Sequence, residues 1–236
     1  IIQRMPATLE LALFSLFIAI VFGIPLGIYA GLKPKSKVSK TIMAGSILGF
    51  SMPTFWVGII FIMIFAVHLG WLPSTGRGEL GTFLGIQSSL FTANGLSHVF
   101  LPALNLALFK MSSVIRLTRA GTREIILQDY ITFARSKGLS EEKVVLVHVL
   151  RNILIPIVTV IGLEFGSLIA FSTVTETIFA WPGMGKLIID SIYNLDRPVI
   201  VAYLMIIVTF FVFLNLLVDI LYSLLDPRVR VKGANE

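Results

Sequence analysis

Five long apolar runs limit what this chain can fold into. They cover residues of about 8–30, 41–69, 99–117, 152–175 and 198–225. A helix needs roughly 20 apolar residues to cross the hydrocarbon core of a bilayer, and each run is near or above that length. Only 14% of the residues are charged and 56% are hydrophobic, whereas soluble domains hold about 25% charged residues. We therefore predict an all-α, polytopic transmembrane helix bundle with five spans.

Lys and Arg side chains collect in three segments that lie between or after these runs. Residues 31–40, 116–151 and 226–236 hold 14 of the 19 Lys and Arg residues. Basic loops of membrane proteins face the cytoplasm, so we expect all three segments and the C-terminus there. The net charge of +6 would then meet membrane lipid head groups, and nucleic acid is not an expected partner. An external N-terminus and a first residue that is Ile lead us to expect one more helix before residue 1.

Small residues and one proline predict how two of the spans pack. Gly23, Gly27 and Gly31 recur every four residues on the first span, and Gly45 and Gly49 do so on the second. Such stripes allow close helix packing in membranes, although glycines that face lipid without a packing role are the alternative. The second span is longer than a bilayer requires and contains Pro53, which offers a kink, so we expect this span to be tilted or bent.

The segment 116–151 is the polar part of the chain, with 11 of its 32 charged side chains. The spacing within it predicts a short helix over 129–137, in which Tyr130, Phe133 and Ala134 share one face. Such a face either docks on a soluble partner or lies on anionic lipid as an interfacial helix.

Signals for helix ends follow this short helix directly. Gly138 is placed to end it in the left-handed conformation, and Ser140 can cap a second helix whose first turn holds Glu141 and Glu142. Leu139 can pack on Val144 as a hydrophobic staple. The sequence therefore predicts a helix, a tight turn and a second helix.

The sequence contains no complete motif for catalysis or metal binding. The PGMGK stretch at 182–186 lacks the earlier Gly and the following Ser or Thr of a phosphate-binding loop, so ATP is expected to bind elsewhere. His68, His98 and His148 are scattered and the chain has no cysteine. We therefore predict no catalytic residue, no metal site and no cofactor in this chain.

Three charged residues fall within or near the apolar runs, namely Lys110, Glu164 and Asp219. Ionisable groups at membrane depth usually face a bundle interior or a water-filled cavity. Lys110 is expected to snorkel or to pair with a neighbouring helix. Glu164 either lines a path or satisfies a structural partner, and the sequence leaves both interpretations open.

The loop ETIFAWPGMGKLIIDSIYNLDRP joins the last two apolar runs. Trp181 is expected to act as an interfacial anchor before a Pro-Gly turn, and residues 185–194 to form a short helix. A plain connecting hairpin is the alternative.

Several of these segments together resemble a known family. DYITFARSKG followed by HVLRNILIP is similar to the cytoplasmic loop of inner-membrane permease subunits of binding-protein-dependent ABC importers. ARSKGL and VHVLRNILIP are close to the TARAKGL and RH-x-LRN-x-L-x-P of the B-type half-permease in the dipeptide, oligopeptide and nickel group. The Glu and Pro of the wider family signature are absent here. MPATLELAL, GIPLGIYAG, LGWLPSTG, ETIFAWPGMG and NLLVDILYSLLDPRVR agree with the same group.

The resemblance implies one permease domain over residues 1–236, with a coupling loop at about 118–151, in a bacterial or archaeal cytoplasmic (inner) membrane. A homologous partner permease would complete an alternating-access path for peptides, nickel chelates or another small solute. Two cytoplasmic ATPase subunits would hold ATP and Mg, and an external binding protein would deliver the substrate.

The resemblance also assigns roles to residues. The residues implied in ATPase coupling are Tyr130, Phe133, Ala134, Arg135, Lys137, Gly138 and Ser140, with Arg135 and Lys137 pairing with carboxylates of the partner. Those implied at an external gate or in contact with the binding protein are Glu176, Trp181, Pro182, Gly183 and Gly185.

Two other functions of the chain are the alternatives to an ABC importer. One is an ion-coupled secondary transporter, which needs paired intramembrane charges and inverted repeats, and the other is a membrane-embedded enzyme.

Overall fold

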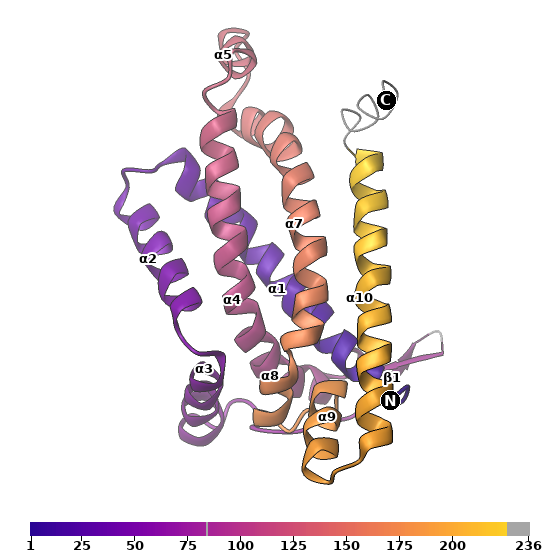
Figure 1. Ribbon diagram of the computed structural model, residues 1–236. Helices are drawn as coiled ribbons and strands as arrows, with labels where there is room; N and C mark the ends of the chain where they lie inside the picture. The colour runs from indigo at the N-terminus through magenta and orange to yellow at the C-terminus, as the bar shows by residue number, and fades with distance from the viewer. Residues whose placement is uncertain (84, 226–236) are drawn as a thin grey trace, which may run out of the picture.

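The described part of the chain is a bundle of helices, as predicted (Figure 1). The computed structural model describes residues 1–83 and 85–225, without the side chains of residues 155, 163, 170, 171, 219 and 221–225. Its long helices are α1 (Met5–Leu32), α4 (Ala93–Ile125), α7 (Leu150–Phe171) and α10 (Arg197–Leu225). Within the described residues, α1, α4 and α10 are each long and apolar enough to cross a membrane.

Two further spans are possible if each is a bent pair of helices. In the first pair, α2 (Lys37–Ser51) meets α3 (Thr54–Phe61) and its π-helical continuation Ile62–His68 at 107°. The bending expected at Pro53 is therefore confirmed, and it is sharp enough to divide the span into two helices. Met52 is extended because the ring of Pro53 disfavours helical backbone in the residue before it, and α3 starts afresh after Pro53.

The second pair joins the polar loop to α7. It begins with α6 (Glu141–Lys143), continues through a π-helical stretch (Val144–Val149) into α7, and bends by 45° between Leu154 and Pro156. The predicted second helix after Gly138 is thus continuous with a long helix of the bundle.

The glycine stripe of the first span lies against a neighbouring helix, as predicted, and that helix is α4. A Cβ atom at Gly27 would lie 2.5 Å from the Cβ atom of Thr118, and one at Gly31 would lie 2.6 Å from that of Thr122. Small residues here let the two backbones approach closely. On α2 the stripe is only half used, because Gly49 approaches Ser112 whereas a Cβ atom at Gly45 would meet no described atom within 4 Å.

The two ends of the bundle differ (Figure 1). One end, called the α5 end, carries α5 (Asp129–Ser136) and the turn between α1 and α2. The other, called the α9 end, carries α8 (Thr173–Ile178), α9 (Met184–Tyr193) and a hairpin of β1 (Gly81–Phe83) and β2 (Ile86–Ser88). The hairpin pairs Gly81 with Ser88 in antiparallel register and leads into a short 3₁₀ helix, Ser89–Phe91; the sequence did not predict it.

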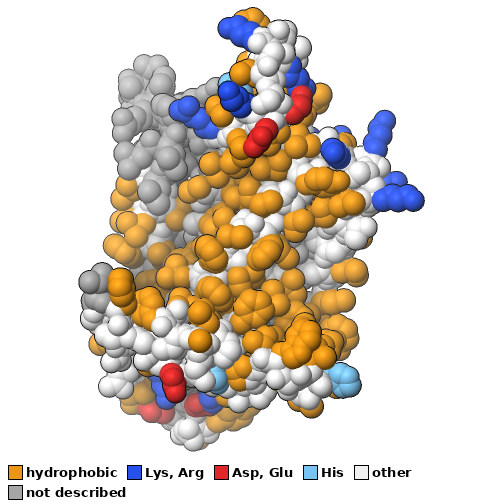
Figure 2. Space-filling view, turned by 180° about the vertical axis from the view of Figure 1, so that it is seen from behind, with side chains coloured by type: hydrophobic (Ala, Val, Ile, Leu, Met, Phe, Trp, Pro, Cys, Tyr) orange, Lys and Arg blue, Asp and Glu red, His pale blue; other side chains and the backbone are white. Residues whose placement is uncertain are grey.

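Charge follows the same division. Figure 2 shows Lys and Arg side chains gathered over the α5 end, above a broad apolar band. Two of the three basic segments, 31–40 and 116–151, therefore lie at one end; the third, 226–236, lies outside the described residues.

Candidate functional site

The short helix α5 has a buried side and an exposed side. Ile131 and Ala134 are buried in a cluster with Val144 and Val149. Tyr130 and Phe133 point away, with 43% and 60% of their surface exposed. The prediction that Ala134 shares the docking face with Tyr130 and Phe133 was wrong, because Ile131 and Ala134 form an i, i+3 pair that packs inward.

The turn after α5 has the predicted conformation. Gly138 has φ of +78°, and its N–H donates to the carbonyl of Arg135 over 2.9 Å. The Ser140 hydroxyl accepts from the backbone N–H of Lys143 over 3.4 Å, so it caps the next helix. Leu139 packs in the cluster that contains Val144. These contacts fix the direction in which α5 leaves the bundle.

The two cations of this loop have partners within the chain. Arg135 donates from Nε and Nη2 to the two carboxylate oxygens of Glu141 over 2.8 and 3.2 Å. The Lys137 ammonium lies 4.5 Å from the centroid of the Phe133 ring. Arg135 thus braces the turn between α5 and α6, a role that the sequence analysis did not anticipate.

At the α9 end, Glu176 is fully buried and joins three helices. Its carboxylate accepts hydrogen bonds from the hydroxyls of Thr8 on α1 over 2.7 Å and of Ser172 over 2.9 Å. It also accepts from the backbone N–H of Lys186, in the first turn of α9, over 3.0 Å. A carboxylate at this position satisfies a free N–H and interacts favourably with the helix dipole.

The glycines of the WPGMG stretch make room for this carboxylate. A Cβ atom at Gly183 would lie 2.4 Å from the carboxylate carbon of Glu176, and one at Gly185 would lie 3.0 Å from an oxygen. Glu176, Gly183 and Gly185 therefore form one packing unit, which we call the Glu176 hub together with Thr8 and Ser172.

Trp181 is buried rather than an interfacial anchor, so that prediction was wrong. Its indole N–H donates to the carbonyl of Ala7 over 2.9 Å. Burial of Glu176 and Trp181 does not fit direct contact with an external protein in this conformation. Pro182 is partly exposed, and the helix predicted over 185–194 is present as α9.

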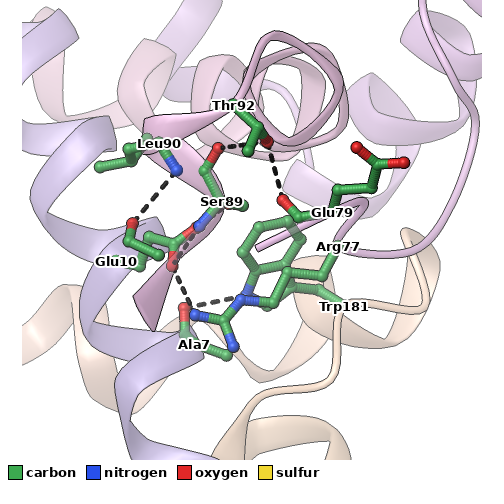
Figure 3. A network of polar contacts seen from close by, with 9 residues as sticks. Ala7, Glu10, Arg77, Glu79, Ser89, Leu90, Thr92 and Trp181 are labelled. Carbon is green, nitrogen blue, oxygen red and sulfur yellow. Dashed lines mark hydrogen bonds and ion pairs between the residues drawn. The ribbon is translucent and has the colours of Figure 1, made fainter. Parts of the chain in front are cut away.

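A second carboxylate network at this end escaped the sequence analysis (Figure 3). Glu10 on α1 pairs with Arg77 over 2.5 Å and accepts from the backbone N–H and hydroxyl of Ser89. The Arg77 guanidinium also lies 6.0 Å from the Trp181 ring. The available signal was a lone acidic residue in the first apolar run and a lone basic residue in 70–98.

Between the two ends, a charged pair lies inside the bundle. The Lys110 ammonium on α4 contacts the Glu164 carboxylate on α7 and donates to the Ser167 hydroxyl over 2.7 Å. Lys110 is 7% exposed, and its predicted pairing with a neighbouring helix is confirmed. The side chain of Glu164 is 32% exposed. The third predicted charge, Asp219, has its side chain outside the described residues.

A cavity of about 330 Å³ opens beside this pair. Lys110 and Ser167 supply its polar atoms together with Thr54, and the rest of its wall is apolar. The apolar lining residues are Leu106, Phe109, Leu168 and Val174. Across the described residues no three His, Asp or Glu side chains gather as a metal site would require.

The model of one protein family matches residues 23–231, and its description is the inner membrane component of binding-protein-dependent transport systems. The chain belongs to this family. It is therefore a multi-pass permease subunit of an ABC importer, and by family a non-catalytic component.

Curated relatives with the same assignment match nearly the whole chain. The di/tripeptide permease protein DppB of Pseudomonas aeruginosa is 43% identical over 95% of this chain and 70% of its own length. The dipeptide permease protein DppB of Escherichia coli K12 is 37% identical over 98% and 73%. The oligopeptide permease protein AppB of Bacillus subtilis is 41% identical over 98% and 71%.

Among solved structures, an inward-facing form of the MetNI methionine ABC transporter superposes with a TM-score of 0.74, covering 95% of both chains. Its sequence is only 18% identical to this one, so the likeness concerns the fold. The overall arrangement of the helices is thus shared with a solved ABC transporter.

Proposed function

We propose that this chain pairs with a homologous permease to form an alternating-access path for peptides or a similar small solute. An external binding protein delivers the substrate, and two cytoplasmic ATPase subunits bind ATP and Mg. The observation that carries the proposal is the match to peptide permeases along nearly the whole chain, at 37–43% identity. ATP binding on the partners would bias a bundle that has two arrangements.

The α5 end is the cytoplasmic side in this proposal, because it carries the basic side chains. Tyr130, Phe133 and Lys137 form the contact with the ATPase, since they are exposed on α5 and in the turn after it. That surface is held in place by four neighbouring residues. Ala134 packs in the buried cluster, Arg135 pairs with Glu141, Gly138 forms the left-handed turn, and Ser140 caps the next helix. Coupling then depends on the angle of α5, which these contacts set.

The α9 end is external in this proposal and works as a gate. The Glu176 hub ties α1, α8 and α9 together, so these helices are expected to move as one body. The binding protein would meet the exposed end of α9, where 84% of Tyr193 and 80% of Leu195 are accessible. Glu176, Gly183 and Gly185 hold the opposite end of α9 at its first turn, and Trp181 and Pro182 directly precede that turn.

Reconstitution tests the proposal. The chain, its partner permease and the ATPases are placed in liposomes, and uptake of a labelled dipeptide is measured with and without ATP, binding protein or ion gradient. Uptake should require both ATP and binding protein. Uptake driven by an ion gradient alone would instead indicate a secondary transporter, for which the buried Lys110–Glu164 pair would be the natural coupling site.

A further inference from the structure

The Lys110–Glu164 pair lies deep in the bundle. Lys110 is near the middle of the 33-residue helix α4, so at 1.5 Å per residue it is roughly 25 Å from either end. Charged groups at such depth are costly and usually face a bundle interior or a water-filled cavity. A buried pair of this kind is also weak evidence for stability, because apolar residues of similar volume pack about as well.

The cavity beside the pair has the properties of a ligand site. Its volume of about 330 Å³ lies at the lower end of the roughly 300–1,000 Å³ found for ligand pockets. The Lys110 ammonium and the Ser167 hydroxyl lie together at its wall, 2.7 Å apart, and they can supply two donors to a carboxylate; Thr54 adds a second hydroxyl. The remaining wall is mostly apolar and contains Phe109, which suits side chains of varied size.

The counter-ion can be exchanged without leaving the more deeply buried charge, that of Lys110, unpaired. Lys110 is almost fully buried, whereas about a third of the Glu164 side chain is exposed. A substrate carboxylate entering the cavity can replace Glu164 on the ammonium while Glu164 turns to its more exposed side. Lys110 then remains paired throughout, which avoids the penalty of an uncompensated buried charge.

We propose that Lys110 and Ser167 form a carboxylate-binding subsite of the transport path, with Glu164 as the resident counter-ion that a peptide's C-terminal carboxylate displaces. The proposal rests on the proposed function of peptide import. It assigns recognition to a group that all free peptides share and leaves the apolar wall to tolerate their side chains.

Substrate selectivity of the reconstituted importer provides the test. Initial uptake rates are compared for a dipeptide and its C-terminal amide, each at a concentration that saturates the binding protein, as checked by titrating that protein alone. Because the same binding protein serves every variant, a difference in the rate ratio between variants must be caused by the permease. For the wild-type protein we expect the free dipeptide to be favoured by about tenfold, the effect of one hydrogen bond to a charged group.

The double variant Lys110→Met with Glu164→Gln keeps the site neutral, so it separates recognition from structure. If the pair recognises the carboxylate, the double variant should insert and transport, but its ratio of dipeptide uptake to amide uptake should fall to about one. A purely structural pair predicts a wild-type ratio, and that result overturns the proposal. Ser167→Ala, which removes a donor but no charge, should lower the ratio several-fold and serves if the double variant fails to insert; an unchanged ratio there also overturns it.

A matched control lies on the same helix. Asn105 is buried and donates to Thr175 over 3.0 Å but does not line the cavity. Asn105→Leu should slow both substrates equally and keep the ratio. If the wild-type importer takes up neither substrate, the proposed function fails; if it takes up both with a ratio near one, the subsite alone fails.

Discussion

Replacing Gly183 with Ala should damage the Glu176 hub. The added Cβ atom would lie 2.4 Å from the carboxylate carbon of Glu176, whereas unstrained carbon atoms stay about 3.5 Å apart. The carboxylate must therefore move by about 1 Å, which breaks its hydrogen bond from the Lys186 N–H. That bond and the overpacking together should cost about 3 kcal/mol.

The assay is thermal unfolding of the purified permease in detergent. For a chain of this size, 3 kcal/mol corresponds to an apparent Tm lower by about 6 °C or more. Gly45→Ala is the matched control, because a Cβ atom there meets no described atom within 4 Å. Its Tm should be unchanged or slightly raised, since Ala favours helix.

A compensating substitution makes the reasoning refutable. Glu176→Asp withdraws the carboxylate by one methylene group and should be destabilising alone, because the hydrogen bonds to Thr8 and Ser172 lengthen. In combination with Gly183→Ala it should cost less than the two separate effects added together. A wild-type Tm for Gly183→Ala, or strictly additive effects in the double variant, would show that the packing of Gly183 on Glu176 is not what the motif provides.

The other predictions concern the α5 end, the glycine stripe and nucleotide binding. Gly138→Val should leave insertion intact but uncouple ATP hydrolysis from uptake, because the positive φ at this position costs a β-branched residue about 1–2 kcal/mol. Gly138→Asn, which tolerates positive φ, should retain coupling. Wild-type transport by the Val variant would refute this. Gly27→Val should lower the level of folded permease, since its side chain collides with Thr118, whereas Gly45→Val should not. The isolated chain should bind no ATP in equilibrium dialysis; stoichiometric binding would contradict the absence of a phosphate loop. Membrane-impermeant thiol reagents added outside should label Thr75→Cys but not Ser36→Cys or Ser140→Cys in this cysteine-free chain, and the reverse pattern would invert the topology.

Local rules account for the parts of the structure that the sequence predicted. Apolar length identified α1, α4 and α10 as spans because the bilayer demands a minimum number of helical residues. Gly138 and Ser140 were predicted because the left-handed turn and the helix cap each depend on one residue type. The glycine stripe on α1 follows from helical periodicity alone.

The sequence did not predict features that depend on contacts between segments far apart in the chain. Helical spacing allows Ala134 to share a face of α5 with either Tyr130 or Ile131. Only the packing of Ile131 and Ala134 against Val144 and Val149 decides between the two. Pro53 predicts a bend in the second span, but no local rule predicts its size of 107°. Thr8 and Glu176 are 168 residues apart, so no local pattern predicts the hub.

Photo-crosslinking can show whether the exposed face of α5 meets an ATPase subunit. A photoreactive phenylalanine analogue at Phe133, which is 60% exposed, should crosslink to the ATPase in membranes that contain the whole importer. The same analogue at Val67, which is 74% exposed at the end of the π-helical stretch, should not. Crosslinking of the ATPase from position 67, or its absence from position 133 in actively transporting membranes, would contradict the account.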